Sequence, residues 1–595
     1  DGTSSDEKGE FQFETYEMGL QILVVSYVGY ETYEQEHDID IARTFEISLE
    51  ELITQASEVV ITAGSFGASD DEKVIVLDPV DIVSVASSRG EISGALEALP
   101  GTQPQADKEG IYVRGGDASE AKQIIDGMLV QNPYFSDVPD IPQRGRFEPF
   151  DFQGTAFSQG GYSAQYGQAL SSIVDLQTWT RFGDFNAHTF GITPIGFRYG
   201  RAYGNDSTYC NLDFNYGNHT LFEDFNNDGF LSNFIKNRTK LSNPPEGKGI
   251  RSSYAKKFNN GIYKYMGRYT EYGLGTSEAD VGLNFDLDNK TTYLLTTYKG
   301  SIGKKWNIQL GLSYSDNKSN AKITSLIHED LIPYTYSDDD PDNDGDTQID
   351  FSANANDELL QFRTVLTRKI FLKSKLKFGT HFFDQSSKFQ NYVFKKLATP
   401  SGDHNIPDNE KSGPVKFDEF LKTGFIELDL RVFKKFALNT GLRYEASDLI
   451  EKSSISPRLS MAYKIGKNSQ TSYAYGQYFQ TPEIGFDQWY RRHNIDFINH
   501  NSIDLEFEKS IHHILNYEWS KNKKTLRLEA FDKQYNNLIT LHSSNACQHS
   551  TQICDNYLSN QGSGYSKGFE MFWRYDQKDN EGVGQDIFFT YSFLD

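Results

Sequence analysis

The sequence predicts a mostly β protein in which a long transmembrane antiparallel β-barrel follows two small N-terminal modules. One indication is composition: aromatic residues make up 14% of the chain, with 35 Tyr and 43 Phe, although the mean hydropathy is −0.58. Membrane barrels need such rings at the lipid interfaces around a polar interior. A second indication is that no run of 18 apolar residues occurs. This excludes a spanning helix and leaves either a soluble protein or one that crosses lipid as a closed barrel.

The third indication is alternation of apolar and polar residues from about residue 181 to 595. Leu212 and Phe214 flank Asp213, for example, and the pattern recurs at 306–314, 426–432, 458–465 and 569–575. An ordinary antiparallel sandwich alternates too, but here the polar face is often charged and rings bracket the apolar face. Because an arginine on the lipid face costs roughly 2–4 kcal/mol at the bilayer midplane, we expect Arg431 and Arg443 to point inward.

Charge and length narrow the class of protein further. Lys and Arg number 58 against 83 Asp and Glu, which gives a net charge of −25. A nucleic-acid-binding surface needs the opposite sign, so no nucleic-acid partner is expected. At 595 residues the chain is too long for a single core and predicts several domains.

The first 75 residues predict a small β module and a linker. Short alternating runs at 9–14, 20–27 and 45–49 predict strands. A β-prone run follows, and after it an acidic stretch rich in Ser and Gly. The run consists of Glu58, Val59, Val60, Ile61, Thr62 and Ala63. Such a segment can add as an edge strand to a partner sheet through main-chain hydrogen bonds; a buried strand is the alternative.

Residues 76–180 predict a small α+β domain that begins with a helix. Apolar residues at i, i+3, i+4 and i+7, from Ile92 to Leu99, form one helical face, and Pro100 with Gly101 ends the helix. Ser88 and Glu91 have the spacing of a capping box.

Glycine-rich loops follow the predicted helix. Arg114 precedes Gly115 and Gly116, which allow positive φ and a close backbone approach. Asp126-Gly127 predicts a hairpin turn. The segments 144–147 and 160–167 complete the domain.

These motifs, in this order, resemble the plug domain of TonB-dependent outer-membrane receptors of the Bacteroidetes type. The residues that carry the likeness are Leu99, Pro100, Gly101, Arg114, Gly115, Gly116, Asp126, Gly127, Gly160, Gly161, Tyr166 and Gly167. Segments 436–444, 455–459 and 474–483 resemble strands of the same family's barrel, so the likeness spans most of the chain.

The resemblance implies four domains. They are a partial carboxypeptidase-regulatory-like β-sandwich at 1–50, the TonB box and linker at 51–75, the plug at 76–180, and an outer-membrane β-barrel at 181–595, with about 22 strands in the family. We expect the natural protein to extend beyond both ends, because the sequence starts partway through the sandwich pattern and stops inside a strand.

The resemblance also implies a function and its partners. The run from Glu58 to Ala63 is the TonB box, bound in the periplasm by the C-terminal domain of TonB, which ExbB and ExbD energise. The receptor would bind a scarce extracellular solute and import it, with Arg114 facing polar wall residues. The alternative is a non-transporting surface or structural barrel that binds a partner, such as a surface lipoprotein, in an outer-membrane assembly. Outer-membrane lipids surround it in either case.

Few motifs in the chain carry chemistry. No hydrolase, zinc-protease or phosphate-loop pattern occurs, so no catalytic residues and no required cofactor are expected. Asp340, Asp342, Asp344 and Asp346 alternate around Gly345 and can converge on a calcium ion, or form an exposed acidic loop. Cys547 and Cys554 are close enough in sequence to close one loop as a disulfide.

Overall fold

The computed structural model describes residues 10–12, 20–25, 33–38, 44–45, 47, 75–77, 79–85, 88–103, 110–135, 144–220, 240–278, 283–303, 305–327, 347–370, 374–399, 402–405, 415–433, 435–466, 468–482, 505–521, 524–543, 556–576 and 586–595. The chain divides into two units, Asp1–Glu58 and Val59–Asp595. No helix in these ranges is long and apolar enough to cross a membrane.

The first unit contains one antiparallel pair of strands, β1 (Leu20–Val25) and β2 (Tyr33–Asp38). The sequence predicted β1 but not β2, whose charged residues have low β propensity. The strands expected at 9–14 and 45–49 are wrong at the described positions, because residues 10–12, 45 and 47 lie outside any strand. Alternation alone does not make a strand, since the backbone also needs a partner for its hydrogen bonds.

The second unit starts with a small α+β domain, here called the plug (residues 75–180). Its elements are β3 (Ile75–Leu77), α1 (Pro79–Ser84), α2 (Ile92–Leu96), β4 (Thr102–Gln103), β5 (Tyr112–Val113), the 3-10 helix η2 (Ala118–Glu120), β6 (Ala121–Ile125), β7 (Met128–Leu129), the 3-10 helix η3 (Pro149–Asp151), β8 (Phe152–Ser158) and β9 (Ser172–Thr178). Five strands form one sheet in the order β3-β8-β9-β6-β7, in which β6 and β9 run parallel. Helix α2 packs into the plug core with Leu96 fully buried.

The structure confirms one local prediction in the plug and corrects another. Asp126 and Gly127 both have positive φ, 48° and 89°, and join β6 to β7 as a tight hairpin, as expected. The capping box at Ser88 is wrong: Glu91 is the N-cap residue of α2, without a side-chain hydrogen bond to the helix. The Ser88 hydroxyl instead accepts from the Gly90 backbone at 3.1 Å, which stabilises the turn before the helix.

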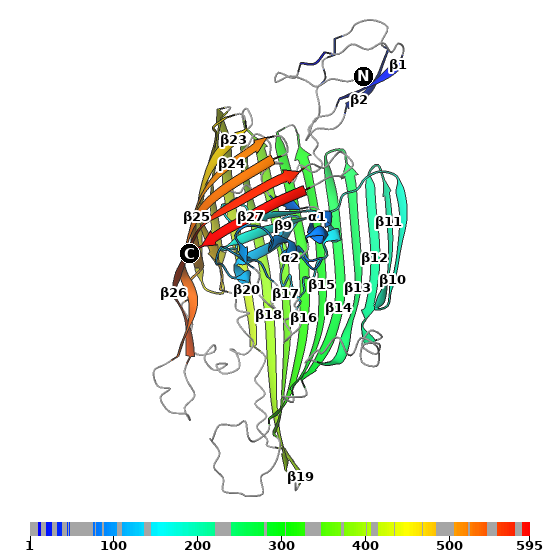
Figure 1. The fold of residues 1–595 in the computed structure, drawn as a ribbon, viewed down its shortest axis with the longest axis vertical. Helices are drawn as coiled ribbons and strands as arrows, with labels where there is room; N and C mark the ends of the chain where they lie inside the picture. The colour runs from blue at the N-terminus through cyan, green and yellow to red at the C-terminus, as the bar shows by residue number, and fades with distance from the viewer. Residues whose placement is uncertain are drawn as a thin grey trace. The chain divides into compact units, whose positions relative to one another are not determined.

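The rest of the unit is a curved antiparallel sheet, here called the wall, which surrounds the plug (Figure 1). Its strands are β10 (Phe185–Thr193), β11 (Gly196–Asn205), β12 (Thr208–Asn218), β13 (Lys240–Phe258), β14 (Gly261–Glu278), β15 (Leu283–Ile302), β16 (Trp306–Ile327), β17 (Thr347–Lys369), β18 (Lys375–Thr399), β19 (Gly402–Asn405), β20 (Val415–Phe433), β21 (Phe436–Ser447), β22 (Lys452–Lys464), β23 (Ser469–Gln480), β24 (Glu508–Lys521), β25 (Lys524–Ser543), β26 (Asn556–Asp576) and β27 (Asp586–Leu594). Successive strands pair in sequence order, and β18 also pairs with β20 because β19 is a short hairpin extension.

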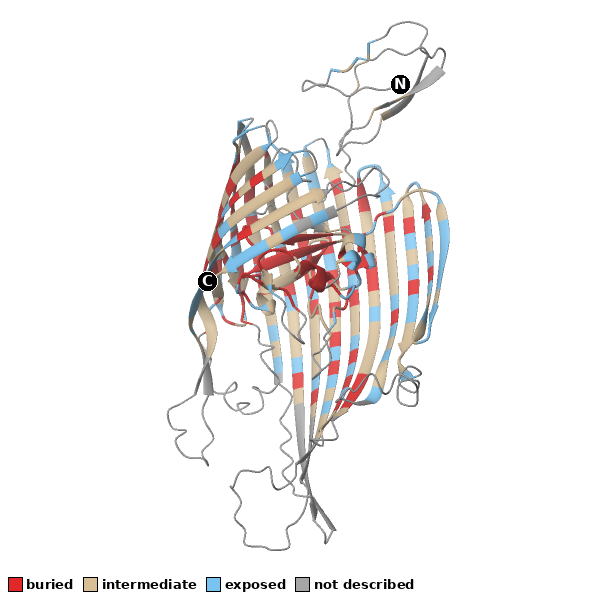
Figure 2. Cartoon of the chain, in the orientation of Figure 1, coloured by how far each residue is buried: buried red, intermediate tan, exposed pale blue. Residues whose placement is uncertain are grey.

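The alternation along the wall is confirmed. Leu212 and Ile426 are exposed on the outer face, whereas Asp213 and Glu427 are buried on the inner face. Arg443 points inward and is fully buried, as expected. Figure 2 shows the alternating colours along the strands and the buried plug inside the wall. The outer face is therefore apolar and the inner face polar, as a membrane barrel requires.

The two ends of the wall differ in the length of their connections. Short turns join β12–β26 at one end, such as 259–260 and 522–523, and longer segments join them at the other, such as 328–346 and 481–507. The sheet has 18 strands in the described part of the chain, with β10 and β27 at its edges. That further strands follow Asp595 stays a prediction.

Candidate functional site: the plug–wall interface and its cavity

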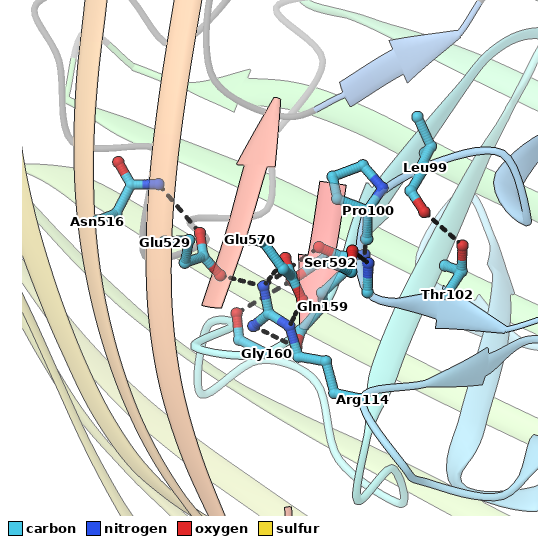
Figure 3. A network of polar contacts seen from close by, with 12 residues as sticks. Leu99, Pro100, Thr102, Arg114, Gln159, Gly160, Asn516, Glu529, Glu570 and Ser592 are labelled. Atoms are coloured by element: carbon cyan, nitrogen blue, oxygen red, sulfur yellow. Dashed lines mark hydrogen bonds and ion pairs between the residues drawn. The ribbon is translucent and has the colours of Figure 1, made fainter. Parts of the chain in front are cut away.

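The plug meets the wall through a buried charge cluster around Arg114, here called the Arg114 anchor (Figure 3). The guanidinium donates to Glu570 on β26 through Nε (2.8 Å) and Nη2 (2.7 Å), and Nη2 also bonds Glu529 on β25. The Phe531 ring lies 4.4 Å from the guanidinium carbon. Burial alone would lower the pKa of Arg114, but the two carboxylates outweigh it and raise that pKa above its usual value. The cluster therefore holds a charged arginine between two strands of the wall.

The backbone around Arg114 explains how the side chain reaches the wall. Arg114 and Gly115 have positive φ, 52° and 74°, in a tight turn that brings Val113 opposite Gly116. From the sequence, the two glycines are expected to allow positive φ and a close backbone approach, and the positive φ is at Gly115. The close approach is at Gly116, because a Cβ there would lie 2.7 Å from the Ser171 Cβ.

The loop at Leu99, Pro100 and Gly101 joins the same cluster. Leu99 is buried in the plug core, and its carbonyl accepts from the Thr102 hydroxyl at 2.6 Å. Gly101 has a φ of 77°, and its backbone N–H donates to the Ser592 hydroxyl on β27 at 2.7 Å. A Cβ at Gly101 would overlap the Glu570 carboxylate. The structure thus brings this motif and Arg114 together on β25–β27.

The loop from Gly160 to Gly167 lies against another part of the wall. Glu427 accepts from the Ser163 hydroxyl at 2.5 Å and the Ala164 backbone at 2.9 Å. Two wall arginines donate to carbonyls of the same loop: Arg458 to Tyr162 at 3.1 Å and Arg443 to Gln165 at 3.2 Å. This loop is therefore held by charge-assisted bonds from three wall strands.

The glycines and the tyrosine of that loop have separate roles. Gly160 (φ 135°) and Gly161 (φ 69°) take backbone conformations that side chains disfavour. A Cβ at Gly167 would overlap the Arg443 guanidinium. Tyr166 is buried within the plug, where its hydroxyl donates to Asp175 at 3.5 Å. These residues shape the plug surface that the wall binds.

In a second charge cluster, here called the Asp151 anchor, the plug supplies the negative charge and the wall the positive charges. The plug carboxylate Asp151 pairs with Arg251 on β13 and with Arg268 on β14, the latter at 2.5 Å. Glu148 lies 3.6 Å from Arg251 and forms a capping box with Asp151 across η3. Arg251 also lies 3.3 Å from the wall carboxylate Asp213. The charges here are shared among several partners.

The hairpin at Asp126 and Gly127 meets the wall at β14 and β17. The Asp126 carboxylate accepts from the Thr178 backbone at 3.2 Å and lies 3.6 Å from the Lys264 ammonium on β14. A Cβ at Gly127 would overlap the Arg363 guanidinium on β17. Both motif residues therefore contact the wall.

The wall partners of these motifs could not be identified from sequence. Glu427, Arg458 and Glu570 stood out only as polar residues at alternate positions of apolar strands. No local motif says which plug residue each one meets, because the pairs are hundreds of residues apart. The only sequence feature that could have indicated these wall residues was a charged residue at an inward-facing position of a strand.

A cavity of about 480 Å³ lies between the plug and strands of the wall. The plug contributes, among others, the segment from Gln131 to Phe135 and Arg146, and β16–β18 and β20 contribute polar, aromatic and aliphatic side chains. Leu449 and Pro482, which follow β21 and β23 at the end with the longer connections, also line it. Its volume is within the roughly 300–1,000 Å³ of small-molecule sites. The cavity therefore lies on the long-loop side of the plug.

Several predicted site residues lie outside the described residues. They are the run from Glu58 to Ala63, the acidic loop with Asp340, Asp342, Asp344 and Asp346, and the pair Cys547 and Cys554. In the described part of the chain, no group of three or more His, Cys, Asp or Glu side chains could hold a metal ion. Cys210 is free there and exposed on β12.

A curved antiparallel sheet with an apolar outer face around a small α+β domain defines a plugged outer-membrane barrel. The family described as TonB dependent receptor-like, beta-barrel matches residues 248–595, more than half of the chain. The chain therefore belongs to this family of TonB-dependent receptors. A CarboxypepD_reg-like domain matches residues 1–61. No curated protein matches the chain. The Bacteroidetes type stays a prediction.

Solved structures share the fold at low identity. The siderophore receptor PirA from Pseudomonas aeruginosa is 12% identical with a TM-score of 0.57, over 88% of this chain and 85% of that one. The outer membrane transporter YddB from Escherichia coli is 11% identical with a TM-score of 0.60, over 87% and 76%. The ferric-catecholate import receptor Fiu from E. coli K12 is 13% identical with a TM-score of 0.58, over 85% and 78%. At these identities the likeness concerns the fold.

Proposed function

We propose that this protein binds an extracellular solute in the cavity between plug and wall and imports it into the periplasm, energised by TonB. The carrying observation is that this cavity lies between the plug and the wall on the long-loop side. In outer-membrane barrels the short turns are periplasmic and the longer loops extracellular. A solute arriving from outside would therefore reach the cavity before the plug. The solute would pass chemically unchanged, without catalytic residues.

Many of the contacts that hold the plug are polar, which suits it to release. Arg114, Asp151 and the loop from Gly160 to Gly167 meet the wall through hydrogen bonds and ion pairs. Water can replace each of these bonds, so they can exchange as a pull loosens the plug. The apolar contacts of the plug core with Met266, Tyr293 and Leu295 of the wall must separate as well. The same contacts close the lumen at rest.

The handle for that pull is the run from Glu58 to Ala63, which we propose lies in the periplasm and binds the C-terminal domain of TonB. In the chain it precedes β3, the edge strand of the plug sheet, which pairs only with β8 there. Three residues of β3 pair with that neighbour, from Ile75 opposite Phe157 to Leu77 opposite Thr155. Force applied before β3 would therefore first reach a short edge strand.

Deletion of residues 58–63 tests this function. Uptake of the solute by energised cells should be abolished, while binding at the cell surface should stay at the wild-type level. Deletion of residues 67–72, of the same length in the acidic linker, is the matched control and should retain uptake. Uptake that survives loss of 58–63 would contradict the proposal. Surface binding without uptake in the wild type, with a co-purified lipoprotein, would instead favour a non-transporting barrel.

A further inference from the structure

The charges that line the cavity differ from those elsewhere at the plug–wall interface. At the two anchors and at Asp126, each plug charge has an opposite charge within 4 Å. In the cavity, Arg146 of the plug and Asp357 and Glu419 of the wall have only neutral partners among the described residues. Three ionisable groups therefore face one space without a counter-charge of their own.

Arg146 is a buried cation held by neutral oxygens. Its side chain donates through Nε to the Asn132 carbonyl at 2.7 Å and through Nη1 to Asn289 Oδ1 at 2.6 Å. Only 3% of the residue is exposed, and burial, reinforced by Arg268, lowers its pKa to about 9. Asp357 opposes that shift without coming within 4 Å. A buried charge without a counter-ion is costly, so an anionic group on a ligand would stabilise it.

The two carboxylates belong to the wall. Asp357 on β17 accepts from the Ser387 hydroxyl at 2.5 Å and from the Asn132 amide at 3.1 Å. Glu419 on β20 accepts from the Ser447 hydroxyl at 2.6 Å. Neither has a cation within 4 Å in the described part of the chain. An ammonium group would find two acceptors on this side of the cavity.

The polar part of the remaining lining is suited to amides, beside aliphatic residues such as Leu359 and Leu421. Gln480 Oε1 is buried without a hydrogen-bond partner, and the Gln385 amide has none among the described residues. Tyr134 and Phe383 add ring faces. Lys122 is a second plug cation in the lining, with contacts of its own. A carboxamide both donates and accepts, which matches the N–H and C=O groups of a peptide bond.

We propose that the cavity binds a zwitterionic, amide-bearing solute of the class of short peptides, with its carboxylate at Arg146 and its ammonium group at Asp357 and Glu419. This inference rests on the proposed solute-binding function. The plug would supply the cationic end of the site and the wall the anionic end, so the ligand would bridge the two. A multiply anionic chelate would meet two wall carboxylates and bind poorly.

Calorimetry on the full chain in detergent tests the charge pattern with four peptide probes and one anionic probe. The peptide probes are trialanine, trialanine amide, N-acetyl-trialanine, and the peptide capped at both ends. Each cap removes one charge-assisted interaction and should weaken binding about 10- to 100-fold. Ferric citrate is the anionic probe and should bind more weakly than trialanine.

Substitutions assign each end of the peptide to its side chain. Arg146→Gln should weaken the binding of trialanine and leave the binding of trialanine amide unchanged. The protein would then no longer prefer the free carboxylate. Asp357→Asn with Glu419→Gln should remove the preference for the free ammonium. Arg144→Gln and Asp418→Asn are matched controls, because these neighbours are exposed, with 67% and 58% of their side chains accessible. Arg146→Lys keeps the charge and provides a second variant if Arg146→Gln does not fold.

The proposal is overturned if trialanine does not bind at 10 mM, if the capped peptides bind as tightly as the free one, or if ferric citrate binds better. These results leave the import function standing, because binding to the purified protein does not involve TonB. Uptake that is independent of residues 58–63 would refute import without affecting the binding data.

Discussion

The two charge clusters that hold the plug differ in how their charges are shared. At the Arg114 anchor, one plug cation faces two wall carboxylates, Glu529 and Glu570. At the Asp151 anchor, Glu148 and Asp213 lie near Arg251 as well, so several partners share the charge. Breaking a buried pair is costly mainly because the remaining charge stays buried and unpaired. Removing the central plug charge should therefore destabilise the docked plug more at the Arg114 anchor than at the Asp151 anchor.

Removing Arg114, the cation that bonds both carboxylates directly, should give the largest effect. Arg114→Met leaves Glu529 and Glu570 facing each other in a buried site, and should destabilise the docked plug by about 3–5 kcal/mol. Hydrogen exchange of amides in residues 110–135 measures this as faster local opening.

Two further variants test whether the unpaired carboxylates cause this loss. Adding Glu529→Gln and Glu570→Gln to Arg114→Met removes the unpaired charges and should recover most of the loss. Arg144→Met, a change at an exposed plug arginine, should alter opening by less than about 0.5 kcal/mol. Equal losses in Arg114→Met and Arg144→Met would show that the anchor does not hold the plug.

Glu120, on the same side as Arg114, should make this anchor sensitive to pH. Burial raises the pKa of Glu120 to about 7 from a usual 4.5, although Lys533 opposes the shift. As pH rises from about 4.5 to 7 the unfolded chain loses its proton first, so stability falls, on the order of 3 kcal/mol in total, and then levels off. Glu120→Gln should remove this fall when plug exchange is measured at pH 5 and pH 8. A fall of equal size in the variant would assign it to other groups.

The Asp151 anchor should tolerate the loss of its central charge better. In Asp151→Asn, Arg251 keeps Asp213 at 3.3 Å and Glu148 at 3.6 Å, while Arg268 loses an ion pair. We expect a loss of about 1–2 kcal/mol, measured by exchange in residues 144–158. If Asp151→Asn lost as much stability as Arg114→Met, sharing the charge among several partners would not reduce the cost of removing one of them.

The sequence predicted local structure well where local residues determine it. The Asp126-Gly127 hairpin and the alternation of Leu212 with Asp213 follow from backbone preference and from contact with lipid. The capping box at Ser88 failed because its spacing also suits a turn before the helix. Strand β2 was missed because pairing with β1, rather than its own residues, stabilises it.

The site itself was only partly predictable. The motif residues Arg114 and Gly116 could be selected, but not their partners Glu529, Glu570 and Ser171, because no pattern within one strand records which distant segment it faces. The cavity charges were also beyond reach. Arg146, Asp357 and Glu419 are far apart in the sequence and line one cavity only because the plug packs inside the wall.

The smallest expected effect concerns the acidic loop with Asp340, Asp342, Asp344 and Asp346, which we propose binds calcium. Extracellular calcium sites have dissociation constants of roughly 10⁻⁴–10⁻³ M, so 5 mM calcium would stabilise the protein by about 1–2 kcal/mol. The shift should appear as a higher melting temperature of the whole protein. Because the loop is in neither anchor, Arg114→Met and Asp151→Asn should show the same shift as the wild type. If calcium does not raise the melting temperature of the wild type, the calcium proposal is wrong and the segment is an exposed acidic loop. If the increase is lost in only one anchor variant, calcium binding depends on that anchor.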